Sequence, residues 1–329
     1  MACPSFPPPA QKITCNNENP FNDEGADIIV RSVTDNVDFR VHKTFLSVAS
    51  SVFRDMLSLP QSEPQLGSGF SAEFMKDGLH IVTLDEDEET LSTLLRMCYP
   101  GWMLMDCGPL FPTIERVLAV FTAATKYAMD GVERAVRAVL VSPRFVEPDP
   151  LRVFALAVRH GLYEEARICA RYTLRTPVLG KPYKPELECI TAGAYHRLQE
   201  YHVRCGAAAQ RVGQDVRWIT NETWVWFECS PCRGNTAVVM AGERRKWVAR
   251  WWADFLAEAS NALRERPSGA TVAINSEVVN TAVERASTCA TCRSRAFREM
   301  HQFCGLFAAE ADKATETVEV EFMPKLMVA

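Results

Sequence analysis

The stretch from Asp27 to Leu59 constrains the fold more than any other part of the chain. It opens with a short β-branched run, Ile28-Ile29-Val30, which predicts a buried strand. A second run, residues 37–41, alternates apolar and polar side chains and predicts a half-buried hairpin partner. From Lys43 the apolar residues recur every three or four positions, as on one face of a helix. Ser50-Ser51 interrupts that pattern and can cap a second short helix.

The order of hairpin, His-Lys pair and two short helices is carried by residues spread along the whole stretch: Asp27, Phe39, Val41, His42, Lys43, Leu46, Ser50, Phe53, Met56 and Leu57. This order closely resembles the BTB/POZ domain. The resemblance implies an α+β domain, a small sheet with helices, over residues 26–145. It also implies an interaction module rather than an enzyme. Within it, His42 is expected to have a structural hydrogen-bonding role, and Asp27 to be a buried or capping carboxylate.

The remaining segments of this half fit the same pattern. Residues 1–25 are rich in proline and asparagine and predict a disordered arm. By resemblance to BTB dimers, where the segment before the first strand can pair across the interface, Phe21 is a candidate to dock. Pro60–Gly78 reads as a loop, either flexible padding or a partner-specific surface. Residues 79–84 predict a third strand. The acidic run 85–89 predicts a helix cap, because carboxylates near a helix N-terminus are favoured by the helix dipole. A calcium site is not expected, because five consecutive acidic residues lack the ligand spacing of a calcium loop.

The second half, residues 146–329, is predicted to be a mostly α-helical domain. Its expected elements are a helix pair over 151–174, a long helix from Leu187 to about 212, a strand at 224–227, helices over 243–264, 276–287 and 295–312, and a terminal strand at 318–322. The long helix has one apolar stripe, which either packs within the chain or forms a coiled-coil seam. The helix from Glu243 is expected to bury Trp247, Trp251 and Phe255.

Two Cys-x-x-Cys pairs suggest chemistry: Cys229 with Cys232, and Cys289 with Cys292. A two-residue gap lets both thiolates of a pair reach one metal, and two pairs complete a tetrahedral structural Zn²⁺ site. Arg233 and Arg293 each follow a pair and would offset the negative charge of four thiolates. The open alternatives are four ordinary thiols near a hydrophobic core and a redox dithiol, because 56 residues separate Cys232 from Cys289. His202 and His301 are candidate replacement ligands.

Composition bounds the class of protein. The 329 residues are 47% hydrophobic and 23% charged, which is an ordinary globular composition. A net charge of −5 leaves no electrostatic footprint for nucleic acid or an anionic membrane, and no apolar run reaches the roughly 18–20 residues of a membrane span. The N-terminus lacks the features of a signal peptide. We therefore expect an intracellular protein, in cytoplasm or nucleus, whose twelve cysteines are thiols or metal ligands.

The resemblance to the BTB/POZ domain implies an adaptor that acts by dimerisation, by partner recruitment, or by docking to a cullin-type ubiquitin ligase scaffold. The layout is similar to the BTB proteins abundant in basidiomycete fungi. The alternative is a zinc-dependent transcriptional regulator that reads DNA through its basic residues, namely Arg244, Arg245, Lys246, Arg293, Arg295 and Arg298. No catalytic set can be assembled, so neither an enzyme nor a small-molecule substrate is expected. The identity of the partner and the oligomeric state stay open.

Overall fold

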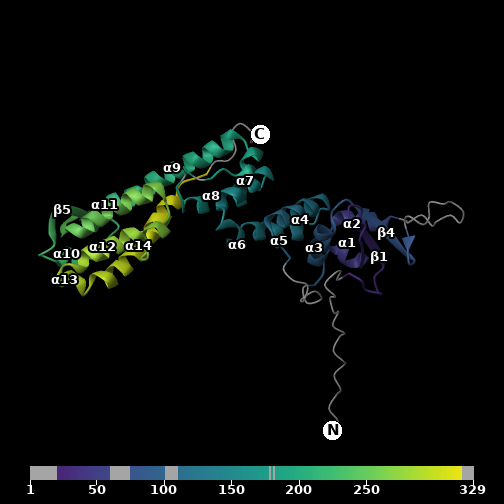
Figure 1. The fold of residues 1–329 in the computed structure, drawn as a ribbon, viewed down its shortest axis with the longest axis horizontal. Helices are drawn as coiled ribbons and strands as arrows, with labels where there is room; N and C mark the ends of the chain where they lie inside the picture. The colour runs from purple at the N-terminus through teal and green to yellow at the C-terminus, as the bar shows by residue number, and fades with distance from the viewer. Residues whose placement is uncertain (1–20, 60–74, 101–109, 178, 181, 321–329) are drawn as a thin grey trace, which may run out of the picture. The chain divides into compact units, whose positions relative to one another are not determined.

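The computed structural model describes residues 21–59, 75–100, 110–177, 179–180 and 182–320, and its contacts divide the chain into two compact units, Met1–Ser142 and Pro143–Ala329 (Figure 1). Most of the predicted disordered arm and of the predicted loop Pro60–Gly78 lies outside the described residues. Phe21 is inside them and is buried, with its ring against Phe39 and Tyr99. This aromatic contact holds Phe21 on its own chain.

The N-terminal unit contains a four-stranded sheet in the order β2-β1-β4-β3. The strands are β1 (Ile28–Ser32), β2 (Asp38–Val41), β3 (Met75–Lys76) and β4 (Leu79–Leu84). Strand β1 runs antiparallel to β2, with Val30 opposite Phe39, and parallel to β4, with Val30 opposite Val82. The β-branched residues of β1 are buried, as expected for a central strand. The predicted hairpin and third strand are confirmed.

Helices complete this unit: α1 (Lys43–Ala49), α2 (Ser51–Ser58), α3 (Glu88–Cys98), α4 (Ile114–Lys126) and α5 (Asp130–Leu140). The break between α1 and α2 is stabilised by Ser50. Its Oγ accepts a hydrogen bond from the Phe53 N–H at 2.9 Å and donates one to the Tyr127 carbonyl at 2.6 Å. Asp87 caps α3 by accepting from the Thr90 N–H at 2.8 Å. Both predicted caps are therefore present.

The C-terminal unit is mostly helical, as predicted. Its helices are α6 (Pro143–Val146), α7 (Pro150–Arg159), α8 (Tyr163–Thr173), α9 (Ala192–Gln214), α10 (Val225–Glu228), α11 (Arg250–Glu265), α12 (Glu277–Ser287), α13 (Ala290–Arg293) and α14 (Ala296–Glu316). One hairpin, β5 (Arg233–Met240) with β6 (Arg244–Ala249), interrupts them. None of the described helices is long and apolar enough to cross a membrane.

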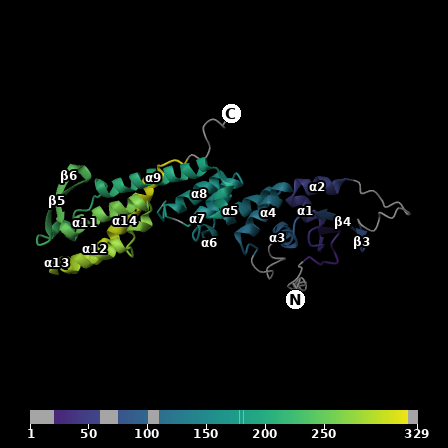
Figure 2. The same cartoon turned by 45° about the horizontal axis from the view of Figure 1, so that its top comes forward.

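The long helix α9 packs within the chain, against α11 and α14 (Figure 2). Two glycines on α9 permit this close approach. A Cβ on Gly206 would lie 2.4 Å from the Arg264 carbonyl oxygen, and a Cβ on Gly213 would lie 2.3 Å from Ser260 Oγ. The apolar stripe of α9 is therefore explained by packing against α11 and α14, without a coiled-coil contact to a second chain.

Three predictions for this unit are wrong. Residues 225–228 form the helical turn α10 rather than a strand. The helix expected from Glu243 begins only at Arg250, because residues 244–249 form a strand that pairs with β5. On that strand Val248 is buried while its neighbour Trp247 is 48% exposed, so Trp247 does not join the core. The terminal strand is absent from Val318 to Val320, and its remaining residues lie outside the described part.

Candidate metal centre

The four cysteines predicted to bind metal come together in the C-terminal unit. Cys229 follows α10, Cys232 immediately precedes β5, Cys289 precedes α13, and Cys292 lies within α13. Their sulfur atoms all lie within 4.8 Å of one another. The Cys229 and Cys289 sulfurs are 3.7 Å apart, and those of Cys232 and Cys292 are 3.8 Å apart. Each short distance therefore joins one cysteine of the first pair to one of the second.

These distances fit one metal ion. A tetrahedral four-thiolate Zn²⁺ site has Zn–S bonds of about 2.3 Å, which places its sulfurs about 3.8 Å apart. A disulfide would require about 2.05 Å between two sulfurs, far less than either distance. The four cysteines can therefore hold a metal ion, with each ligand supplied by the protein.

A shared aromatic core positions the two cysteine pairs despite their separation in sequence. Cys229 and Cys292 are buried in this core, and Cys232 and Cys289 pack against it. At its centre Trp226 of α10 stacks on Trp252 of α11, with ring centroids 5.4 Å apart and planes inclined by 8°. The intervening hairpin and helices α11 and α12 lead the chain back to the first pair, which explains the long spacing.

The electrostatic environment differs between the sulfurs. The backbone N–H groups of Cys292 and Thr291 and the Cys232 and Cys229 side chains hydrogen-bond to Cys289 and lower its pKa to about 6. Burial raises the pKa of Cys232 to about 11 and raises that of Cys292 as well. Metal ligation requires thiolates, so the amides at Cys289 favour the binding form while burial of the other two opposes it in the absence of a cation.

Trp251 is a residue of this site that the sequence did not reveal. It is buried at the start of α11, and its indole acts against the effect of burial on the Cys292 pKa. Its Nε1 has no hydrogen-bond partner, sulfur included, among the described residues. The tryptophan-rich sequence marks a core, but only the fold places one indole beside a sulfur.

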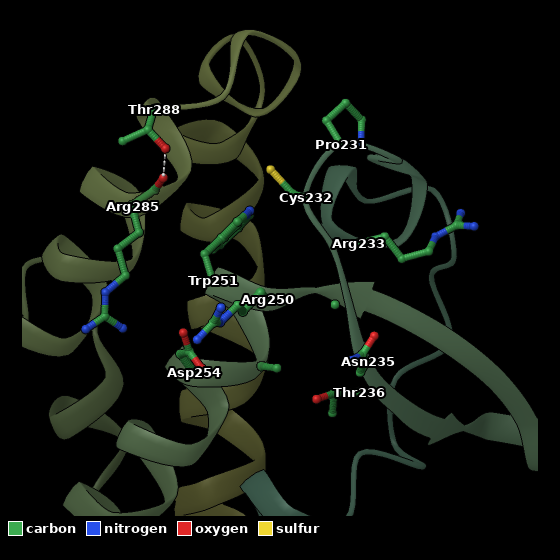
Figure 3. A pocket seen from close by; sticks show the side chains of 12 residues that line it. Pro231, Cys232, Arg233, Asn235, Thr236, Arg250, Trp251, Asp254, Arg285 and Thr288 are labelled. Carbon is green, nitrogen blue, oxygen red and sulfur yellow. Dashed lines mark hydrogen bonds between the residues drawn. The ribbon is translucent and has the colours of Figure 1, made fainter.

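Arg233 and Arg293, which were expected to offset the thiolate charge, do not lie against the sulfurs. Arg293 donates from Nε to the Ser287 carbonyl at 2.9 Å, and Arg233 extends away from Cys232 (Figure 3). In the described structure neither guanidinium is hydrogen-bonded to a cysteine sulfur. His202 is buried and its Nε2 lies 3.0 Å from the Thr176 carbonyl oxygen, and His301 is exposed on α14. The four-cysteine group contains neither histidine, which agrees with their interpretation as surface or capping residues rather than replacement ligands.

We expect the Trp251→Phe substitution to weaken zinc binding about tenfold or more, because the indole lowers the pKa of Cys292 and loss of a polar group behind a metal ligand typically has that effect. Competition with a chromophoric chelator measures the affinity. Trp252→Phe is the matched control, since its Nε1 is also buried without an acceptor among the described residues. Equal weakening by both substitutions would show that Trp251 acts only through packing.

In the N-terminal unit, Asp27 and His42 have the structural roles expected of them. Asp27 Oδ1 accepts from the Lys43 N–H at 2.7 Å, at the beginning of α1. The His42 backbone N–H donates to the Tyr99 hydroxyl at 2.8 Å, and its ring Nδ1 lies 3.2 Å from the same oxygen. These bonds join the first helix to the residue that ends α3.

Comparison with known families agrees with this architecture: residues 18–143 match the family model of the BTB/POZ domain. The N-terminal unit is a BTB/POZ domain. BTB domains are generally interaction modules rather than enzymes. No curated protein matches the chain.

The BTB domain presents apolar side chains to solvent on its first two helices. Val48 of α1 is 83% exposed, Val52 of α2 is 41% exposed, and Leu59 follows α2 with its side chain also exposed. Exposed apolar residues that lie near one another mark interaction surfaces more often than isolated ones do. These helices are therefore the first place to look for a contact with another protein.

Proposed function

We propose that this protein is an adaptor that binds other proteins through its BTB domain and carries a C-terminal unit held together by one Zn²⁺. The BTB fold is the observation that carries the adaptor role. Affinity would come from a few apolar anchors buried at the contact, with no bond made or broken. Homodimerisation, recruitment of a different protein and docking to a cullin-type scaffold are three forms of this role, in a reducing intracellular compartment.

Zinc is the metal we propose for the four cysteines, because a site of four thiolates at tetrahedral separation is typical of structural zinc. Cys229 and Cys232 would hold the ion from the segment between α10 and β5, and Cys289 and Cys292 would hold it from the segment at α13. With all four positions filled by protein, the ion would cross-link these segments. Such a site supplies stability rather than catalysis.

DNA binding has less support. Lys246 pairs with Glu222 at 3.0 Å, and Arg244 pairs with the same carboxylate. Arg295 pairs with Glu228 at 2.7 Å and with Glu299 at 2.6 Å. Since these cations are neutralised within the chain, the basic stripe that phosphate binding needs is much reduced.

Self-association through α1 and α2 is the first form of the adaptor role to test. The double substitution Val48→Asp/Val52→Asp is expected to convert a dimer to a monomer, because placing charge at apolar anchors costs about 2 kcal/mol or more at each hot spot. Light scattering after gel filtration measures the mass. Val203→Asp is the control, since Val203 is 63% exposed on α9 in the other unit. A dimer that survives the double substitution would place the contact elsewhere.

A further inference from the structure

A cavity of about 800 Å³ opens beside the cysteine site, with Cys232 in its wall, and the proposed metal binding does not fill it. Its walls come from the segment Pro231–Thr236, from the first turn of α11 and from α12 (Figure 3). The volume is in the range of specific ligand pockets and is far larger than a single small anion needs.

The charged groups that line this cavity are mainly cationic. Arg233 and Arg250 form neither an ion pair nor a side-chain hydrogen bond within the described part of the chain. Arg285 pairs with Glu258 at 2.8 Å, and Asp254 is the carboxylate among the lining residues. Three arginines therefore line the cavity together with one carboxylate, and two of the three have no ion pair in the described structure, in a chain whose net charge is −5. A local excess of unpaired guanidinium groups favours carboxylate ligands.

Strand β5, which borders the cavity, has residues that are not paired with a neighbouring strand. Arg233 pairs with Ala249 and Ala237 pairs with Trp247, and a register shift lies between them. Gly234, Asn235 and Thr236, which line the cavity, therefore have no paired residue on β6. Because the sheet has two strands, the outer edge of β5 is also free of a neighbouring strand in the described structure. Such edges accept an added strand from another chain.

We propose that this cavity binds an extended acidic peptide segment of a partner protein. The peptide backbone pairs with the free edge and bulge of β5, and its Asp or Glu side chains bind Arg233 and Arg250. This gives the C-terminal unit a docking surface of its own, separate from the BTB domain. It depends on the surface of the C-terminal unit and not on the identity of the metal.

Two features favour a peptide over a nucleic acid. A free strand edge recognises a peptide backbone, which nucleic acids lack. Asp254 also lies on the wall with Arg250 and Arg285, and Glu258 is paired with Arg285, so both carboxylates would repel a continuous run of phosphates. A peptide can place its carboxylates at selected positions and avoid them.

The test measures fluorescence anisotropy of a labelled eight-residue peptide of alternating Glu and Val, added to the full-length protein at low and at physiological salt. A peptide with Lys in place of Glu and a single-stranded oligonucleotide are parallel probes. The double substitution Arg233→Glu/Arg250→Glu is expected to weaken binding of the acidic peptide at least tenfold. The control is Arg211→Glu/Arg266→Glu, which changes the net charge equally at residues that do not line the cavity.

Selective loss in the cavity variant, with native circular dichroism retained, supports the proposal. Equal loss in the control variant would mean that the whole-protein charge governs binding, and this would overturn the assigned site. Binding of the Lys peptide with similar affinity, or tighter binding of the oligonucleotide, would overturn the assigned ligand class. Metal content measured on the same samples separates this result from the zinc proposal, because a failure to bind the peptide in zinc-loaded protein counts against the peptide site alone.

Discussion

Removal of the metal from the full-length protein is expected to unfold the C-terminal unit and leave the BTB domain folded. Structural Zn²⁺ in small domains binds with about 10–16 kcal/mol, and this binding free energy is folding free energy. The free energy of unfolding of a whole domain is about 5–15 kcal/mol, so loss of the binding free energy of the ion is enough to unfold the unit. Without the metal, the thiols of Cys232 and Cys292 remain in a core whose packing brings four sulfurs within 4.8 Å.

Hydrogen exchange with mass spectrometry checks this expectation unit by unit. After chelation, peptides from α10, α11 and α14 should lose protection, while peptides from β1 and α4 should retain it. Cys232→Ser should have the same effect without a chelator. Cys189→Ser is its matched control, because Cys189 is an exposed thiol outside the cysteine site. Full protection of α11 and α14 in the metal-free protein would contradict a structural role for the ion.

Trp226→Ala is expected to cost the C-terminal unit about 3–5 kcal/mol of unfolding free energy, the range for truncating a large buried aromatic side chain. Trp226 is 1% exposed and lies at the centre of the aromatic core, stacked on Trp252 and edge-on to Trp251 and Phe303. Its removal leaves a cavity against several rings at once, and aromatic pairs contribute beyond the area that they bury. Chemical denaturation followed by circular dichroism measures the loss.

Trp247→Ala is the matched control for this substitution. Trp247 is half exposed on β6 and has a cation–π contact with Arg245, whose guanidinium carbon lies 5.7 Å from the ring centroid. Truncation there should cost about 1 kcal/mol or less, since exposed cation–π pairs contribute about 0.5–1 kcal/mol. A cost for Trp247→Ala equal to that for Trp226→Ala would contradict the placement of the core.

The BTB half was predictable because its signals are local. The β-branched run of β1, the alternation of β2, and the caps at Ser50 and Asp87 each specify their own backbone conformation. The hairpin β5–β6 was missed because its exposed edge carries few large apolar residues. Arg244, Arg245 and Lys246 resemble the start of a helix when their pairing with Val238–Met240 is not known. Only that pairing places Trp247 on a strand, where its side chain is half exposed.

For the cysteine site, the sequence identified the residues but not their surroundings. Cys-x-x-Cys spacing alone implies that the two thiolates of a pair can reach one metal ion. The fold confirms that the two pairs come together. The role of Trp251 depends on how the fold brings the start of α11 to Cys292, which no local spacing encodes. The ion pairs of Arg244, Lys246 and Arg295 likewise depend on carboxylates brought close by the fold, including Glu222 and Glu228.

Native mass spectrometry of the purified protein, with and without a strong chelator, tests the account most directly, because it reports metal content and subunit number together. We expect one zinc per chain in a dimer, with the zinc lost on chelation and the charge states shifting as the C-terminal unit opens. A metal-free monomer with unchanged charge states would contradict the account, reducing the four cysteines to core thiols and excluding self-association.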